Sequence, residues 1–150
     1  MYFFMFSGVP ASGKSTIAKL IAKHYQIPYF ARDDTQRFLF QQGLVTENTV
    51  DGYLWTLEMA RVQLNIGVGC VLDAVFGKQG FRDDVQAIAE TTGAKFIPVY
   101  CTCSDEILWK TRWHQRAATN HPAHWNNPTW ADVERIANNF EDWTHPDVIH

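Results

Sequence analysis

Residues 6–20 read FSGVPASGKSTIAKL, and residues 8–15 within them fit the pattern G-x-x-x-x-G-K-[ST] at every fixed position. The apolar run that precedes the pattern, residues 2–6, is short enough for one buried strand. Behind the pattern, apolar side chains recur at three- and four-residue steps and indicate a helix: Ile17, Leu20, Ile21 and Tyr25. A strand, a glycine loop and a helix in this order predict a loop that binds phosphate.

The residue types of this loop suit a nucleoside triphosphate. Gly8 and Gly13 allow positive φ angles, so that backbone N–H groups can curl around an anion. Lys14 is expected to reach the β- and γ-phosphates, and the Ser15 hydroxyl to ligate Mg²⁺. The remaining residues of the predicted nucleotide site are Pro10, Ala11, Ser12 and Thr16. The alternative is an ordinary turn that contains glycine.

Composition predicts one folded domain over residues 1–150 and restricts the kinds of molecule that this domain is expected to bind. Hydrophobic residues make up 46% of the chain, which is typical of a globule with a real core. The net charge of −3 gives no overall attraction to nucleic acid or to an anionic membrane, although a local basic groove is compatible with it. The start of the chain lacks the basic region of a signal peptide. The three cysteines lie in or beside predicted strands and fit free thiols, so a cytoplasmic location is expected.

Short apolar runs alternate with longer helical patterns along the chain. Strands are predicted at 2–7, 28–31, 69–75 and 95–101, and helices at 14–25, 34–42, 47–66, 78–92, 104–118 and 129–142. Apolar strands separated by helices indicate a parallel sheet with both faces covered. Ligands of such sheets bind beyond the carboxyl ends of the strands. Residues 147–150 look like the opening of a fifth strand that is incomplete.

Residues 31–37, ARDDTQR, follow the second predicted strand and suggest a reaction. Asp34 and Arg37 share a face if they lie on the first turn of a helix. A carboxylate facing the phosphate loop can take a proton from an attacking hydroxyl, and an arginine can hold an anionic acceptor. The alternative is that Asp33 or Asp34 only caps the helix.

Three stretches of the chain resemble one family in the right order. They are GVPASGKSTIAKLIAKHYQIPYFARDDTQRFLF (8–40), GVGCVLDAVFGKQGFRDDVQAIAETTGAKF (67–96) and SDEILWKTRWHQR (104–116). Together they resemble the P-loop kinases of the polynucleotide 5′-kinase and zeta-toxin type, which are AAA-type ATP-binding, kinase-like domains. The resemblance implies an α/β P-loop NTPase fold with a parallel five-stranded sheet, helices on both faces and a small helical lid at about 112–130.

The resemblance also implies roles for particular residues. Asp34 looks like the general base, with Asp33 as the competing candidate, and Arg37 like the residue that holds the acceptor or the transferred phosphate. Arg112 and Arg116 look like lid arginines that bind the nucleotide, and Arg116 together with Lys14 would neutralise charge during transfer.

For several residues further along the chain, the sequence leaves two interpretations open. Asp73 ends an apolar run as a Walker B acid would, and it either holds Mg²⁺ through water or contacts the acceptor. Arg82 is interpreted as a surface residue, with an acceptor contact as the alternative. The tryptophans of the lid region either stack on a nucleobase or pack beneath the lid: Trp113, Trp125 and Trp130.

The expected function is an ATP- and Mg²⁺-dependent phosphotransferase that moves the γ-phosphate to a hydroxyl acceptor. That acceptor is a nucleic-acid 5′-hydroxyl, a nucleotide or a related small molecule, and the charge of the chain does not favour nucleic acid. The alternatives are a non-catalytic ATP-binding module, or a sugar or antibiotic kinase on the same fold.

Overall fold

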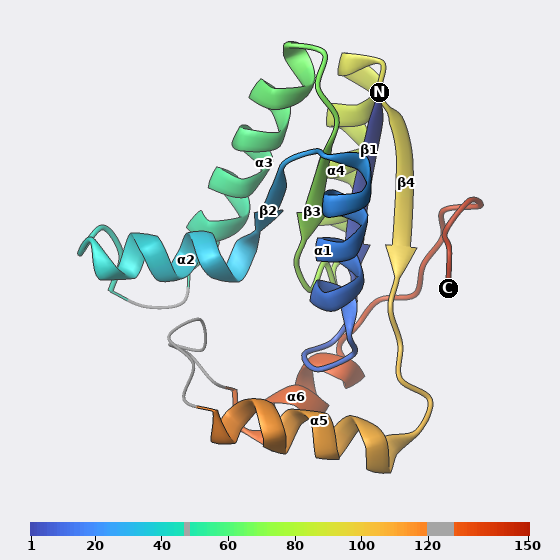
Figure 1. The fold of residues 1–150 in the computed structure, drawn as a ribbon. Helices are drawn as coiled ribbons and strands as arrows, with labels where there is room; N and C mark the ends of the chain where they lie inside the picture. Colours follow the sequence, from blue (N-terminus) through green and yellow to red (C-terminus); the bar gives the residue numbers. More distant parts are fainter. Residues whose placement is uncertain (47–48, 120–127) are drawn as a thin grey trace.

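The computed structural model describes residues 1–46, 49–119 and 128–150 (Figure 1). In these residues a parallel sheet of four strands forms the centre, in the order β2-β3-β1-β4. The strands are β1 (Tyr2–Ser7), β2 (Tyr29–Ala31), β3 (Cys70–Asp73) and β4 (Lys95–Tyr100). Each of them lies within a segment that the apolar pattern predicts as a strand.

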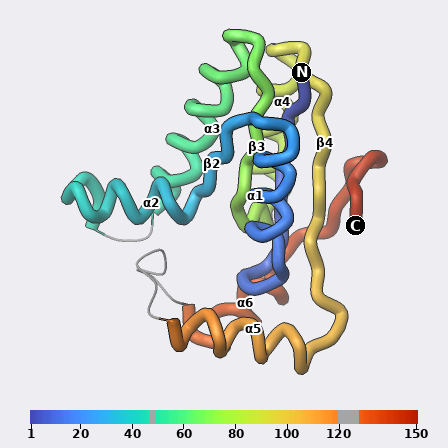
Figure 2. The backbone as a smooth tube through the Cα atoms, viewed as in Figure 1, coloured from blue at the N-terminus to red at the C-terminus, as the bar shows by residue number. Residues whose placement is uncertain are grey.

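The described part of the chain contains six helices: α1 (Lys14–Tyr25), α2 (Arg32–Gln41), α3 (Asp51–Asn65), α4 (Gln79–Thr92), α5 (Glu106–Ala118) and α6 (Trp130–Asn138). Figure 1 shows α5 and α6 beyond the carboxyl ends of the strands, on the side to which the arrows point. Figure 2 shows α2 and α3 beside β2, whereas the C-terminal segment runs beside β4 at the opposite edge.

The apolar residues of β1 alternate between two cores. Phe3 and Met5 pack against α3 and α4 on one face of the sheet. Phe4 and Phe6 pack against Ala18 and other residues of α1 on the opposite face. Because both faces are covered, β1 has an unbroken apolar run rather than a polar alternation.

The expected five-stranded sheet is wrong for the described residues, which contain four strands. Where the fifth strand was expected, Ile149 alone forms a parallel bridge to Val99 of β4. The residues before it are held in a turn, in which the N–H of Asp147 donates to the His145 ring and the N–H of Val148 to the His145 carbonyl. Backbone N–H groups that bond within this turn are not available to extend the pairing along β4.

Two helix boundaries differ from the pattern for physical reasons. Helix α2 starts at Arg32, directly after β2, and its N-cap residue Ala31 has no side chain to cap it. Neither Asp33 nor Asp34 is therefore the cap. Helix α6 ends at Asn138 instead of 142, because the N–H of Glu141 donates to the carbonyl of Gly77. No described helix has the length and apolarity that a membrane crossing requires.

Candidate functional site

The loop between β1 and α1 has the backbone conformation that an anion-binding turn needs. Gly8 and Gly13 have φ angles of 143° and 99°, and Ala11 has a φ of 64°. Gly8 is also crowded, since a Cβ there would lie 2.3 Å from the carbonyl oxygen of Cys101. Glycine at position 8 is thus required by conformation and by space.

Buried polar groups converge on this loop without partners. Lys14 is only 5% exposed, and among the described residues its ammonium has no hydrogen bond or ion pair. The Ser12 hydroxyl is buried and unpaired as well. The loop lines an open cavity of about 450 Å³ together with Arg112 and Arg116. Burying a cation without an anion is costly, so the site has the charge and the donors to receive an anionic ligand.

A smaller cavity of about 180 Å³ adjoins the loop and brings three carboxylates together with three cationic side chains. The acids are Asp33 and Asp34 from the start of α2 and Asp73 from the end of β3. Lys14, Lys19 and Arg116 supply the positive charge, and Ser15 also lines the cavity. The carboxyl ends of neighbouring parallel strands thus place these residues in one neighbourhood, as expected.

Tyr29 orients Asp73 within this cavity. Its hydroxyl donates to Oδ2 of Asp73 at 2.6 Å, and Asp73 is only 4% exposed. Burial, followed by the charge of Asp73, raises the pKa of Tyr29, so the phenol keeps its proton and remains a donor. The other oxygen, Oδ1, is buried and unpaired. Sequence reasoning missed Tyr29, because the two residues are 44 positions apart.

The donor set in this cavity fits Mg²⁺. Magnesium binds proteins through one or two carboxylates, keeps several waters and takes its remaining ligands from substrate phosphates. The free Oδ1 of Asp73 and the hydroxyl of Ser15 supply oxygens of this kind. No group of three or more His, Cys, Asp or Glu side chains suited to a metal is found in the described residues, so a site built entirely from such groups is absent there.

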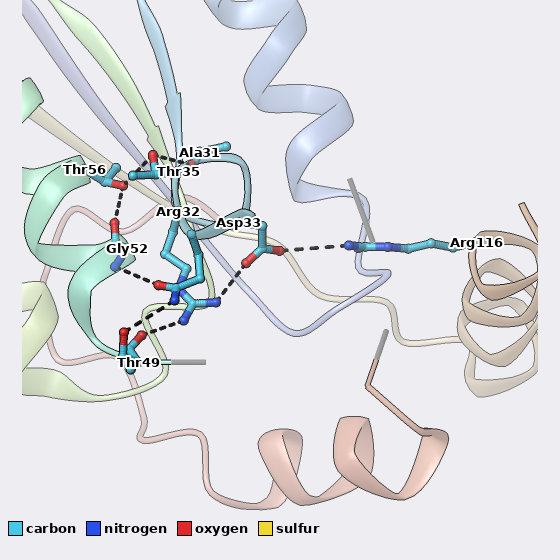
Figure 3. Close-up of polar contacts among 9 residues, drawn as sticks. Ala31, Arg32, Asp33, Thr35, Thr49, Gly52, Thr56 and Arg116 are labelled. Atoms are coloured by element: carbon cyan, nitrogen blue, oxygen red, sulfur yellow. Dashed lines mark hydrogen bonds and ion pairs between the residues drawn. The ribbon is translucent and has the colours of Figure 1, made fainter. Parts of the chain in front are cut away.

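The two adjacent acids of α2 pair with different arginines. Asp34 forms an ion pair with Arg37 at 2.9 Å, which confirms that these two residues share a face. Asp33 pairs with Arg32 at 3.3 Å and lies 3.9 Å from Arg116 on α5, as Figure 3 shows. Arg37 lines neither of the two cavities at the loop, whereas both acids line the smaller one. Arg37 therefore acts on the site indirectly, through its ion pair with Asp34.

Helix α5 lies against the phosphate loop through a residue that sequence reasoning also missed. The Nε1–H of Trp109 donates to the carbonyl of Pro10 at 2.8 Å. Trp109, Arg112 and Arg116 are spaced i, i+3 and i+7, so they share one helical face, and this spacing was a readable signal. Trp109 packs edge-on against Trp130 of α6 at 4.8 Å.

The expected lid at about 112–130 is described only in part. Residues 112–119 and 128–130 belong to or flank α5 and α6, whereas residues 120–127, including Trp125, lie outside the described residues. Trp113 also packs against Trp130, with ring centroids 6.0 Å apart. These contacts favour the packing interpretation of Trp113 and Trp130 over base stacking.

The surface interpretation of Arg82 is wrong. Arg82 is only 2% exposed, and it donates to the carbonyls of Glu141 and Asp142 at 3.0 and 3.1 Å. Its guanidinium also lies 4.7 Å from the centre of the Trp143 ring. Arg82 lines neither cavity at the loop and fastens the C-terminal segment to α4 instead.

A family model described as "AAA domain" matches residues 3–141, which is nearly the whole chain. The chain belongs to this AAA domain family. Among curated relatives, an uncharacterized protein of Mycobacterium tuberculosis (strain H37Rv) is 25% identical over 114 residues, which cover 67% of this chain and 23% of that protein. An uncharacterized protein of Mycobacterium bovis matches with the same identity and the same coverage of both chains. The chain thus spans less than a quarter of the length of these relatives.

Solved structures with the same fold as this AAA domain include kinases. A candidate kinase from Chloroflexus aurantiacus has a TM-score of 0.78 at 17% identity, covering 99% of this chain and 85% of that one. Kti12 of Chaetomium thermophilum, in complex with ADP-AlF3, has a TM-score of 0.75 at 14% identity, covering 98% and 87%. A gluconokinase from Sinorhizobium meliloti has a TM-score of 0.67 at 18% identity, covering 99% and 80%. At these identities the likeness establishes the shared α/β fold.

Proposed function

We propose that this AAA domain is a P-loop kinase, an ATP- and Mg²⁺-dependent phosphotransferase that moves the γ-phosphate of ATP to a hydroxyl acceptor. The observation that carries the proposal is the buried, unpaired Lys14 at the phosphate loop, which faces a cavity that also contains Asp33 and Asp34. An unpaired buried cation suits a polyphosphate, and a carboxylate beside the γ-phosphate suits the activation of a hydroxyl.

The chain's own groups supply positioning and charge. The loop amides and Lys14 hold the phosphates, and Arg112 and Arg116 approach the same cavity from α5. Asp34 accepts the proton of the acceptor hydroxyl, and its ion pair with Arg37 fixes the direction of the carboxylate. Asp33 is the competing base, but its approach to Arg116 suits a contact that holds α5 near the nucleotide.

Ser15 and Asp73 are the residues that hold Mg²⁺ in this proposal. The ion, when bound, neutralises charge on the β- and γ-phosphates. Tyr29 keeps one oxygen of Asp73 engaged, and the other oxygen has no hydrogen-bond partner.

The acceptor classes are a nucleic-acid 5′-hydroxyl, a nucleotide, a sugar and a related small molecule. The gluconokinase and the sugar kinase among the similar structures motivate testing sugars, on the basis of fold alone. The net charge of −3 disfavours a long nucleic acid. The alternative function is a non-catalytic ATP-binding module, for which a base beside the γ-phosphate has no use.

Transfer of labelled γ-phosphate from ATP with Mg²⁺ tests the proposal. The acceptors are 5′-hydroxyl oligonucleotides, nucleosides, simple sugars and aromatic alcohols. We expect Asp34→Asn to abolish transfer while ATP affinity is retained, and Asp33→Asn to reduce it less. Asp84→Asn, a change of the same chemistry on the exposed side of α4, is the control and should leave transfer unchanged. ATP binding without transfer to any acceptor would support the binding module instead.

A further inference from the structure

A third hollow, of about 480 Å³, lies between β2, α2 and α3 and meets the phosphate site at Asp34. Tyr29, Ala31 and Asp34 line both this hollow and the 180 Å³ cavity beside Lys14. One carboxylate therefore stands at the boundary between the two spaces. A molecule in the hollow can present a group to Asp34 while the phosphate site is occupied.

The wall of this hollow away from Asp34 is apolar and unusually exposed. It includes Phe38 from α2, Leu44 from the turn after α2, and Trp55 and Met59 from α3. Trp55 is 55% exposed and Phe38 57%, so two aromatic rings face water beside the site. Exposed apolar groups gathered around a concave surface are typical of a ligand pocket, and the volume is that of a small-molecule site.

The charge of the hollow restricts what it can hold. Among the described residues, no lysine, arginine or histidine lines it, and Asp34 is its one carboxylate. Arg37 pairs with Asp34 but does not line the hollow, so an acceptor that carries a phosphate or a carboxylate would meet the carboxylate there and no lining cation of its own. A sugar would leave several hydroxyls against apolar side chains, where few hydrogen bonds are available.

We propose that this hollow binds the acceptor, and that the acceptor is an uncharged alcohol with an aromatic body. The inference rests on the proposed kinase function and specifies its substrate class. The ring lies among Phe38, Trp55 and Met59, and the hydroxyl points to Asp34. The acceptor oxygen forms a bond to the γ-phosphorus as the bond from that phosphorus to the β–γ bridging oxygen breaks. The proton passes to Asp34, and ADP leaves with the electron pair of the broken bond.

Binding measured without ATP tests the hollow independently of catalysis. The probe is 2-(2-naphthyl)ethanol, titrated against the chain by saturation-transfer NMR, with glycerol and gluconate as polar probes. Met59→Glu places a charge in the wall, and we expect it to weaken binding about tenfold or more. Val62→Glu is the matched control, because Val62 is a half-exposed apolar residue of α3 that does not line the hollow, and it should change little.

Phosphate transfer then separates the two proposals. Transfer to the naphthyl alcohol that Met59→Glu removes and Val62→Glu retains supports both. Transfer to glycerol, gluconate or an oligonucleotide but not to the naphthyl alcohol overturns this inference and leaves the kinase intact. Binding of the naphthyl alcohol with no transfer to any acceptor overturns the kinase and the acceptor role together. Self-association of the chain that Met59→Glu abolishes would instead make this face a contact between copies, which also overturns the inference.

Discussion

Replacing Gly8 by alanine should destabilise the fold because the end of β1 has no room for a side chain. The added Cβ would lie 2.3 Å from the carbonyl oxygen of Cys101 and 2.9 Å from the Ser12 hydroxyl. The hydroxyl can rotate, whereas the carbonyl belongs to the backbone that follows β4. The backbone must therefore shift by about 1 Å to restore ordinary contact.

The magnitude follows from what this shift disturbs. The N–H of Gly8 donates to the carbonyl of Val75 at 3.1 Å, and the N–H of Cys101 to the carbonyl of Ser7 at 2.9 Å. Weakening these two bonds costs about 1 kcal/mol each. Holding alanine at a φ of 143° costs about 1–3 kcal/mol more. We therefore expect a loss of about 3–5 kcal/mol in the free energy of unfolding, together with loss of ATP binding.

Equilibrium unfolding in urea, followed by circular dichroism, measures this loss. Gly43→Ala is the control, because Gly43 also has a positive φ, 68°, but has no atom within 4 Å of the added Cβ. Its cost should be about 1–2 kcal/mol, the price of the conformation alone. If Gly8→Ala costs no more than Gly43→Ala, the contact with Cys101 is not the cause, and the reasoning fails.

Three further predictions concern α5, the C-terminal segment and the core. Trp109→Phe keeps an aromatic ring but removes the donor to Pro10, and should lower the free energy of unfolding by about 1 kcal/mol and weaken ATP binding in calorimetry. Arg82→Met removes two hydrogen bonds to the carbonyls of residues 141–142 and should cost about 3 kcal/mol in urea unfolding. Burial raises the pKa of the Cys70 thiol from 9.0 to about 12. The unfolded chain therefore loses this proton first, and stability should fall as pH rises from 9 towards 12. Relative to Cys70→Ala, the chain should lose about 1.4 kcal/mol between pH 8 and pH 10.

Each of these predictions has its own check. Trp113→Phe alters the neighbouring ring of the same cluster and should leave ATP affinity unchanged; an equal loss would assign the effect to packing. Arg82→Lys should recover little stability, since lysine lacks the planar pair of donors, and a full recovery would contradict that explanation. If the free energy of unfolding falls equally with rising pH in the unmodified chain and in Cys70→Ala, this thiol is not the cause of the loss of stability at alkaline pH.

Local patterns predicted the elements of this fold well. The strand–loop–helix unit around Gly8–Ser15 needs only a short apolar run, two glycines and a 3.6-residue period, and all of these lie within about 20 residues. The parallel sheet followed from apolar strands separated by helices. The Asp34–Arg37 pair was predictable too, because residues three apart on a helix are neighbours.

Contacts between distant segments were decided by tertiary packing alone. Tyr29 meets Asp73 across 44 residues, and Trp109 meets Pro10 across 99. Arg82 is indistinguishable in sequence from an exposed first-turn arginine until residues 141–142 fold over it. The same holds for the approach of Arg116 to Asp33 and for the single bridge at Ile149. The sequence alone determined which segments are strands, helices and an anion-binding loop, since short-range sterics and apolar periodicity control these. Only the tertiary structure decided which polar groups share a cavity, because that depends on how surfaces far apart in the chain pack together.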